Sequence, residues 1–218
     1  MMQLQTPVTI PQPKFDIPPF ECILLVGSCF AQNMGKRFVD AQFRATVNPY
    51  GVMYNPASIL HTAERCGESP AVAIFTLGTN HVYCWKETGE FSDNCRKLPK
   101  KLFEEKELSV DECVDFLNQA VTILKERNPQ VQVVLTVSPI RYAKYGFVAS
   151  GLSKATLLLA TNRLLGLHPD CTSYFPAYEL MNDELRDYRF YAPDMLHPSE
   201  QAVEYIWQRF TDAYLSFS

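Results

Sequence analysis

The chain has 218 residues, 47% of them hydrophobic, and carries a formal net charge of −4. That length and composition fit one α/β domain with a single core. Lysines and arginines are scattered among acidic residues, which argues against nucleic-acid binding. No apolar run approaches the roughly 20 residues of a membrane helix, which argues against a membrane-embedded protein.

The first 20 residues differ from the rest because they contain five prolines. Proline fixes φ and lacks a backbone N–H, so we expect an extended arm over residues 1–20. This stretch has no basic segment followed by a continuous apolar one, so it does not resemble a secretory signal peptide. A single domain is expected over residues 21–218.

Strand and helix patterns alternate in the first half of that domain. In chain order we predict a buried strand over residues 22–26, a helix over 31–43 and a turn-rich stretch over 48–56. A helix opened by Pro56 then runs over 56–66, and a second buried strand over 71–78. Thr88 and Gly89 indicate a short hairpin, and residues 91–108 are expected to form a surface excursion.

The second half repeats the alternation. Ser109 and Glu112 form a capping box that starts a helix, which ends before Pro129. We then predict a strand over residues 131–137, a helix over 153–166 and a strand over 172–175. A partly helical stretch follows over 177–188, and a final helix over 198–215. Such alternation predicts a mostly parallel sheet covered by helices on both faces.

Three small residues follow predicted strands and should share one edge of the sheet. Ser28, Gly78 and Ser138 each come just after an apolar run. Because sites in parallel sheets form beyond the carboxyl ends of the strands, this edge is the expected location of a functional site.

Ser28 and the distant segment "DMLH" suggest nucleophilic catalysis. A serine hydroxyl needs a base, which His197 can supply, and Asp194 stands three residues before His197 where it can orient the imidazole. Pro198 favours the first position of the final helix, which would hold His197 at its start. The competing interpretation of Ser28 is a helix cap. Cys29 is another candidate nucleophile, but we expect its side chain to turn toward the sheet.

The order of these residues resembles that of the SGNH, or GDSL-like, hydrolases, in which the serine follows the first strand and the acid and base lie together near the C-terminus. The blocks "GSCFAQNMGKRF", "NPYGVMYNPASI", "TLGTNHVY", "TVSPIRY", "LSKATLL" and "YFPAYELMNDELRDYRFYAPDMLHPS" resemble the GSCFA-domain family of that superfamily. The resemblance implies a flavodoxin-like three-layer α/β/α sandwich. It also implies Ser28 as nucleophile, with Asp194 and His197 as its acid and base.

An acyl transfer also needs donors for the tetrahedral oxyanion. The backbone amide of Ser28 is one candidate. The resemblance suggests the amide of Gly51 and the side chain of Asn80 as further donors, while Asn94 and Asn48 compete with Asn80 for that role. Tyr142 and Arg96 stand where family members tend to have histidine.

The remaining polar residues indicate no second chemistry. The seven cysteines are widely spaced and include no Cys-x-x-Cys pair, which is typical of a reduced cytoplasmic protein. The other histidines show no metal-ligand spacing, so we expect no metal and no cofactor. The charged stretch "ELRDYRFY" is interpreted first as a buried ion-pair network that braces the Asp194–His197 loop, and second as a substrate-binding segment.

These features predict a serine esterase that removes a small acyl group, such as acetyl, from a sugar or similar polyol. Its partner would be a small-molecule ester, and the sequence says nothing about its oligomeric state. An O-acyltransferase would use the same triad, and a non-catalytic binding module would keep the fold without the chemistry.

Overall fold

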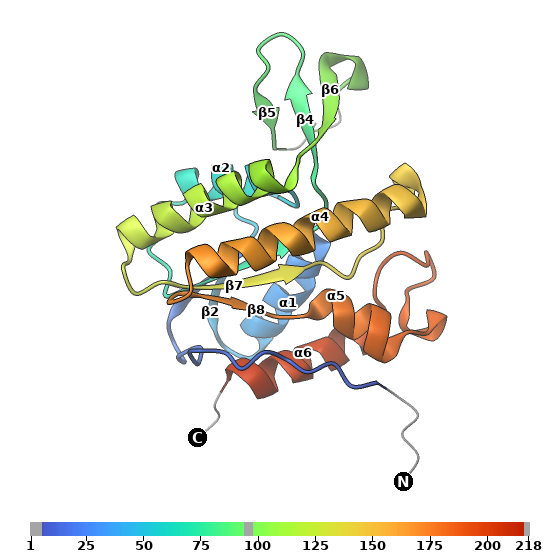
Figure 1. Cartoon of the computed structure of the whole chain (residues 1–218). Coiled ribbons are helices and arrows are strands. Elements are labelled where there is room, and N and C mark those ends of the chain that lie inside the picture. The colour runs from blue at the N-terminus through green and yellow to red at the C-terminus, as the bar shows by residue number, and fades with distance from the viewer. Residues whose placement is uncertain (1–5, 94–97, 216–218) are drawn as a thin grey trace.

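A computed structural model describes residues 6–93 and 98–215, and its centre is a five-stranded parallel sheet (Figure 1). The strands lie in the order β2-β1-β3-β7-β8. Their bounds are Cys22–Gly27 for β1, Arg44–Val47 for β2, Val72–Leu77 for β3, Gln132–Val137 for β7 and Thr172–Tyr174 for β8. This is the flavodoxin-like order, with the topological switch between β1 and β3. The α/β prediction is therefore confirmed.

The register of the central strands brings the expected edge residues together. Gly27 of β1 pairs with Thr76 of β3, and Leu77 pairs with Val137 of β7. Ser28, Gly78 and Ser138 each follow one of these paired residues, so all three lie at the carboxyl edge of the sheet. Crevices at this edge, beside the switch point, are where doubly wound sheets bind ligands.

Helices cover both faces of the sheet, and each face has its own hydrophobic core (Figure 1). One face carries α2 (Pro56–Arg65), α3 (Val110–Arg127) and α4 (Gly146–Leu167). The other carries α1 (Cys29–Asp40), α5 (Ala177–Glu179) with its π-helical continuation η3 (Leu180–Leu185), and α6 (Glu200–Tyr214). Three single 3₁₀ turns complete the helical elements: η1 (Lys100–Leu102), η2 (Ala143–Tyr145) and η4 (Tyr188–Phe190). No helix in the described residues is long and apolar enough to cross a bilayer.

The stretch expected as a surface excursion contains strand structure. β4 (His81–Trp85) pairs with β5 (Phe91–Ser92), which confirms the hairpin at Thr88 and Gly89. β6 (Phe103–Glu107) then pairs antiparallel with β4, so this small sheet projects from the body of the protein (Figure 1). Sequence patterns missed β6 because "FEEKE" has only one apolar residue and pairs on an exposed edge.

The start of the last helix needs correction, and one edge strand was not predicted. The final helix begins at Glu200, and Ser199 caps it by accepting from the backbone N–H of Ala202. Pro198 therefore lies before the cap and not at the first helical position, and it pairs with Tyr191 in an isolated antiparallel bridge. The short edge strand β2 was also not predicted, because only four residues pair and none of them is fully buried.

Residues 6–20 of the N-terminal arm pack along α6 as an extended segment (Figure 1). The backbone N–H of Ile17 donates to the carbonyl of Tyr214, and that of Val8 donates to buried Glu184. Glu184 also pairs with Arg209, which binds the carbonyl of Val8. The one buried acid of the "ELRDYRFY" region thus fixes the arm to α6. The predicted ion-pair network around the Asp194–His197 loop is wrong.

Candidate active site

The junction between β1 and α1 is shaped by a close approach to β3. Gly27 has a φ of +145°, and a Cβ at this position would lie 2.2 Å from the carbonyl oxygen of Thr76. The backbone N–H of Ser28 donates to that oxygen at 3.1 Å and to Thr76 Oγ1 at 3.0 Å. Only glycine fits this approach, which bends the chain from strand to helix.

Ser28 faces the sheet and caps α1. Its hydroxyl accepts from the N–H of Phe30 at 3.2 Å and lies 3.2 Å from Thr76 Oγ1. Only 1% of Ser28 is exposed. Within the described residues it makes no hydrogen bond to His197, so the predicted contact between the two is absent. The structure therefore favours the cap interpretation, and the role of Ser28 as nucleophile stays a prediction.

We expect Ser28→Ala to lower the free energy of unfolding by about 1–2 kcal/mol, because the mutation removes a helix cap and leaves the N–H of Phe30 without its acceptor. Chemical denaturation measures the change. Ser109→Ala is a matched control, since Ser109 caps α3 in the same way at an exposed position. Destabilisation no larger than the spread between repeat measurements would contradict the cap role.

Cys29 occupies the first position of α1 and is half-exposed. It is less buried than Ser28, but it also packs against the hydrophobic core on the α1 face of the sheet, which agrees with the expected direction of its side chain. Its thiol is free. No hydrogen bond of its backbone N–H is found within residues 6–93 and 98–215, as is usual for the first residue of a helix. A free thiol and an unpaired N–H thus stand together at a helix N-terminus.

Asp194 and His197 form the contact predicted from their spacing. Asp194 Oδ2 lies 2.6 Å from His197 Nδ1, while Oδ1 accepts from the backbone N–H groups of Leu196 and His197. Mainly these two backbone hydrogen bonds, and then the imidazole, lower the pKa of Asp194 to about 2. Asp194 is therefore a carboxylate at neutral pH, and it fixes His197 with Nδ1 toward the acid.

The Asp194–His197 loop is tied to the loop that follows β7. The backbone N–H of Arg141 donates to Leu196 O at 3.0 Å, and the guanidinium donates to Met195 O at 3.3 Å. His197 Nε2 makes no hydrogen bond to any described residue, and 42% of the side chain is exposed. The nitrogen that would act as base is therefore free and accessible.

Tyr142 connects this loop to the carboxyl edge of the sheet. A Cβ at Gly78 would lie 2.7 Å from the Tyr142 hydroxyl and 2.9 Å from Tyr54 Cβ, so the two tyrosines close over Gly78. Burial raises the pKa of Tyr142, so the phenol is protonated at neutral pH. Residues 141 and 142 thus link the Asp194–His197 loop to the end of β3 at Gly78.

The predicted oxyanion donors are engaged elsewhere. The N–H of Gly51 donates to Asn48 O at 2.9 Å, and the N–H of Ser28 donates to Thr76. The side chain of Asn80 is 4% exposed, and its amide donates to Leu108 O at 2.7 Å, which secures the start of α3. As placed here, none of these groups points a free donor at a substrate.

Asn48 and Asn94 were the competing donors. Asn48 Oδ1 accepts from the N–H of Gly27 at 2.9 Å, so this side chain supports the β1–α1 bend. Its Nδ2 is buried without a partner among the described residues and does not reach solvent. Asn94, like Arg96, lies outside the described residues.

Lys154 was not recognised from the sequence. It is 3% exposed, and its Nζ donates to the carbonyls of Gly78 and Ser138 at 2.7 Å each. Burial lowers its pKa to about 7. Lys154 joins the ends of β3 and β7 beneath the candidate site. The sequence "LSKATLLLA" predicts only a helix, and the burial of Lys154 becomes evident only from the packing of α4 on the sheet.

Two of the other three histidines are hydrogen-bonded, whereas His81 is buried and stacks on Tyr145. His61 pairs with Asp93, and His168 lies 2.6 Å from Asn118 Oδ1. The six cysteines within the described residues are free thiols. Those residues contain no group of three or more histidine, cysteine or acidic side chains that could hold a metal ion.

Comparisons with known proteins agree with this architecture. The pattern of the GSCFA family matches residues 22–72 and 61–210. No curated protein sequence matches the chain.

Among solved structures, a catalytic mutant of an acetylxylan esterase from Geobacillus stearothermophilus has 12% identity and a TM-score of 0.61, with 91% of this chain and 96% of that one covered. A GDSL-like lipase from Bacteroides thetaiotaomicron has 12% identity and a TM-score of 0.57, with 88% and 87% covered. An alpha/beta hydrolase enzyme from the metagenome of Lake Arreo, Spain, has 12% identity and a TM-score of 0.59, with 90% and 96% covered. At such identities the likeness shows the fold alone.

Proposed function

The chain belongs to the GSCFA family and has the fold of GDSL-like lipases and esterases, and from this premise we propose that it cleaves carboxylic esters by nucleophilic catalysis. The observation that carries the proposal is the Asp194–His197 pair, with Nδ1 held at 2.6 Å by the carboxylate and Nε2 free. This arrangement prepares an imidazole to accept a proton from a nucleophile. No metal or cofactor takes part in the proposed reaction.

We propose Cys29 as the nucleophile. Ser28 was the residue expected from the sequence, but its hydroxyl is buried and bonded to Thr76 and Phe30. Cys29 is the more exposed of these two adjacent residues at the start of α1. A thiol also needs less activation than a hydroxyl. Ser28 remains the alternative, and it would require a rotation of its side chain away from Thr76.

The reaction would run in two steps. In the first, Cys29 Sγ attacks the ester carbonyl carbon as His197 Nε2 accepts the thiol proton. The tetrahedral intermediate collapses, the carbon–oxygen bond to the alcohol breaks, and His197 returns the proton to the leaving alkoxide. In the second, His197 takes a proton from water, the resulting hydroxide attacks the thioester, and the carboxylic acid leaves as Cys29 regains its proton. Asp194 stabilises the imidazolium in both steps.

Two donors are available for the oxyanion. The free backbone N–H of Cys29 stands at the N-terminus of α1, where the helix dipole favours negative charge. The second is the Tyr142 hydroxyl, which stays protonated because its pKa is raised and which makes no hydrogen bond to another described residue. Tyr142 would thus take the part that the sequence pattern suggested for Asn80.

We expect Tyr142→Phe to lower kcat by about 10²–10³-fold, the usual effect of losing one oxyanion donor. KM should change little, because the phenol stabilises the transition state more than the substrate. Steady-state kinetics on a short-chain ester measure both values. Tyr145→Phe is the matched control, since its ring stacks on His81 away from Cys29. A Tyr142→Phe variant with unchanged kcat would remove Tyr142 from the site.

The proposed substrate carries a small acyl group such as acetyl on a sugar or polyol. Tyr54 and Tyr142 close over Gly78, so this edge of the sheet has little room for a long acyl chain. The similar acetylxylan esterase is named for an acetylated sugar polymer, which agrees with this choice. A thiol nucleophile also suits the reducing cytoplasm, which we propose as the location of the protein.

The test uses the purified full chain with 4-nitrophenyl acetate, the matching octanoate, and acetylated methyl xyloside. We expect turnover of the acetyl esters and little of the octanoate. Product analysis with added glycerol separates hydrolysis from acyl transfer, since a transferase would form acetylglycerol in place of acetate. If well-folded protein cleaves none of the esters and transfers no acyl group, the proposal fails and the binding-module interpretation is favoured.

A further inference from the structure

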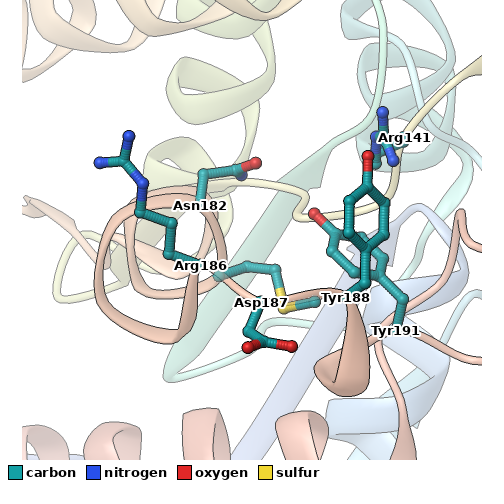
Figure 2. A pocket seen from close by; sticks show the side chains of 7 residues that line it. Arg141, Asn182, Arg186, Asp187, Tyr188 and Tyr191 are labelled. Atoms are coloured by element: carbon teal, nitrogen blue, oxygen red, sulfur yellow. The ribbon is translucent and has the colours of Figure 1, made fainter.

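A surface pocket lies beside the Asp194–His197 loop, between the loop after β7 and the segment that joins η3 to η4 (Figure 2). It is lined by Arg141, Met181, Asn182, Arg186, Asp187, Tyr188 and Tyr191. The catalytic proposal uses none of these side chains. Arg141 nevertheless connects the two regions, because it binds the carbonyls of Leu196 and Met195 in the catalytic loop.

Arg141 is a cation held by aromatic rings and not by an acid. Its guanidinium lies 4.1 Å from the ring centre of Phe147, 5.5 Å from that of Tyr191 and 6.0 Å from that of Tyr188. It has no carboxylate partner within the described residues. Cation–π contacts of this kind orient a guanidinium and leave its N–H donors available for a ligand.

The rest of the pocket adds a second positive charge. Arg186 is exposed and has no ion pair or side-chain hydrogen bond among residues 6–93 and 98–215, and Asn182 stands between it and Arg141 in Figure 2. The one acid of the pocket, Asp187, pairs with Arg189 at 3.7 Å and accepts from its backbone N–H at 2.8 Å. In Figure 2 its carboxylate points away from Arg141. The free charge of the pocket is therefore positive.

The aromatic residues of the pocket supply a surface for a ring. Tyr188 is 65% exposed, and its ring centre lies 6.0 Å from that of Tyr191. Aromatic faces next to hydrogen-bond donors are suited to the apolar face of a sugar, and the guanidinium fork is suited to a planar carboxylate or to a phosphate.

We propose that this pocket binds an anionic group, a carboxylate or a phosphate, on the sugar or polyol part of the ester substrate. Arg141 binds the anion, Arg186 adds attraction, and Tyr188 with Tyr191 contact the ring. The inference rests on the proposed ester-cleaving function and adds a substrate class to it. It assigns to "ELRDYRFY" the substrate-binding role that was its second interpretation.

Binding can be measured without catalysis. In calorimetric titrations of the full chain we expect methyl galacturonate glycoside and methyl galactoside 6-phosphate to bind at least tenfold more tightly than neutral methyl galactoside. The comparison of the two anions decides between carboxylate and phosphate. Arg141→Gln should remove the preference for anions. Arg44→Gln is the control, because it removes an exposed arginine of the edge strand β2 that has no ion-pair partner in the described part of the chain.

A kinetic arm separates this inference from the proposed function. The acetylated forms of the same three glycosides are compared by kcat/KM for wild type and Arg141→Gln. A fall in the ratio of kcat/KM for anionic over neutral ester in Arg141→Gln supports the pocket, whatever the variant's rate on the neutral ester. Equal affinity and equal kcat/KM for neutral and anionic sugars would overturn it, even if all esters are cleaved. Preferred binding of anions without cleavage would keep the pocket and refute the esterase.

Discussion

Cys29→Ala is expected to lower ester cleavage by at least about 10⁴-fold while the protein stays folded, because it removes the group that forms the acyl-enzyme. Cys29 is half-exposed at the first position of α1, and alanine is compatible with that position. Initial rates on 4-nitrophenyl acetate measure the loss, and the thermal melting curve checks that the fold is intact.

The adjacent serine provides the decisive comparison. Cys29→Ser should retain part of the activity, since a hydroxyl at the same position can attack through His197. Ser28→Ala should lose stability but keep cleavage within about tenfold of wild type, because we assign Ser28 a capping role. The opposite pattern, full activity in Cys29→Ala and none in Ser28→Ala, would return the nucleophile to Ser28 and show that its side chain rotates away from Thr76.

Covalent labelling of the nucleophile gives an independent answer to the same question. Iodoacetamide should label wild type at Cys29 and abolish activity, and the label should be absent from Cys29→Ala. The other five described thiols set the background, and three of them, Cys66, Cys113 and Cys171, are buried. Mass spectrometry of peptides identifies the labelled residue. A fluorophosphonate adduct on Ser28 would support the serine assignment in its place.

The second large effect is expected from the base. His197→Ala should reduce kcat by about 10³–10⁴-fold with almost no change in melting temperature, since the imidazole is half-exposed and its main contact is with Asp194. Asp194→Asn should reduce kcat by about 10²–10⁴-fold, because an amide in place of the carboxylate favours the wrong tautomer. If His197→Ala unfolds the protein, His197 is structural and the mechanism loses its base.

The pKa of Asp194 makes a separate prediction about pH. Hydrogen bonding holds this pKa at about 2 in the folded protein, below its ordinary value of 3.8. A lowered carboxyl pKa contributes stability that is present above pH 3.8 and is lost as the pH falls to about 2. Acid denaturation should therefore show a smaller loss for Asp194→Asn than for wild type in that window. Equal losses would mean that these hydrogen bonds do not persist in solution.

Periodicity in the sequence was enough for the main architecture. Three runs of mostly aliphatic residues need burial on both sides, which the middle of a covered sheet provides. They are "CILLV", "AVAIFTLG" and "VQVVLTV", and they form β1, β3 and β7. Local spacing was likewise enough for the Asp194–His197 contact and for the capping box at Ser109, because each joins groups within one turn of the chain.

Contacts between distant segments decided what local patterns left open. Nothing near residue 28 in the sequence reveals that β3 approaches Gly27 so closely that Thr76 takes both the amide and the hydroxyl of Ser28. That approach holds the hydroxyl of Ser28 inward, between Thr76 and the first turn of α1. Asn80 shows the same dependence, because the start of α3 supplies the carbonyl that engages its side chain.

The sequence by itself therefore determined the layers of this protein, the sheet edge where Ser28, Gly78 and Ser138 meet, and the contact between Asp194 and His197. The tertiary structure alone decided that Ser28 is buried against Thr76 and that an arginine pocket adjoins the Asp194–His197 loop. The physical reason is range: hydrophobic periodicity and capping act over a few residues, whereas the direction of a side chain at a strand–helix junction is set by packing and hydrogen bonds from strands and loops that are far away in the chain.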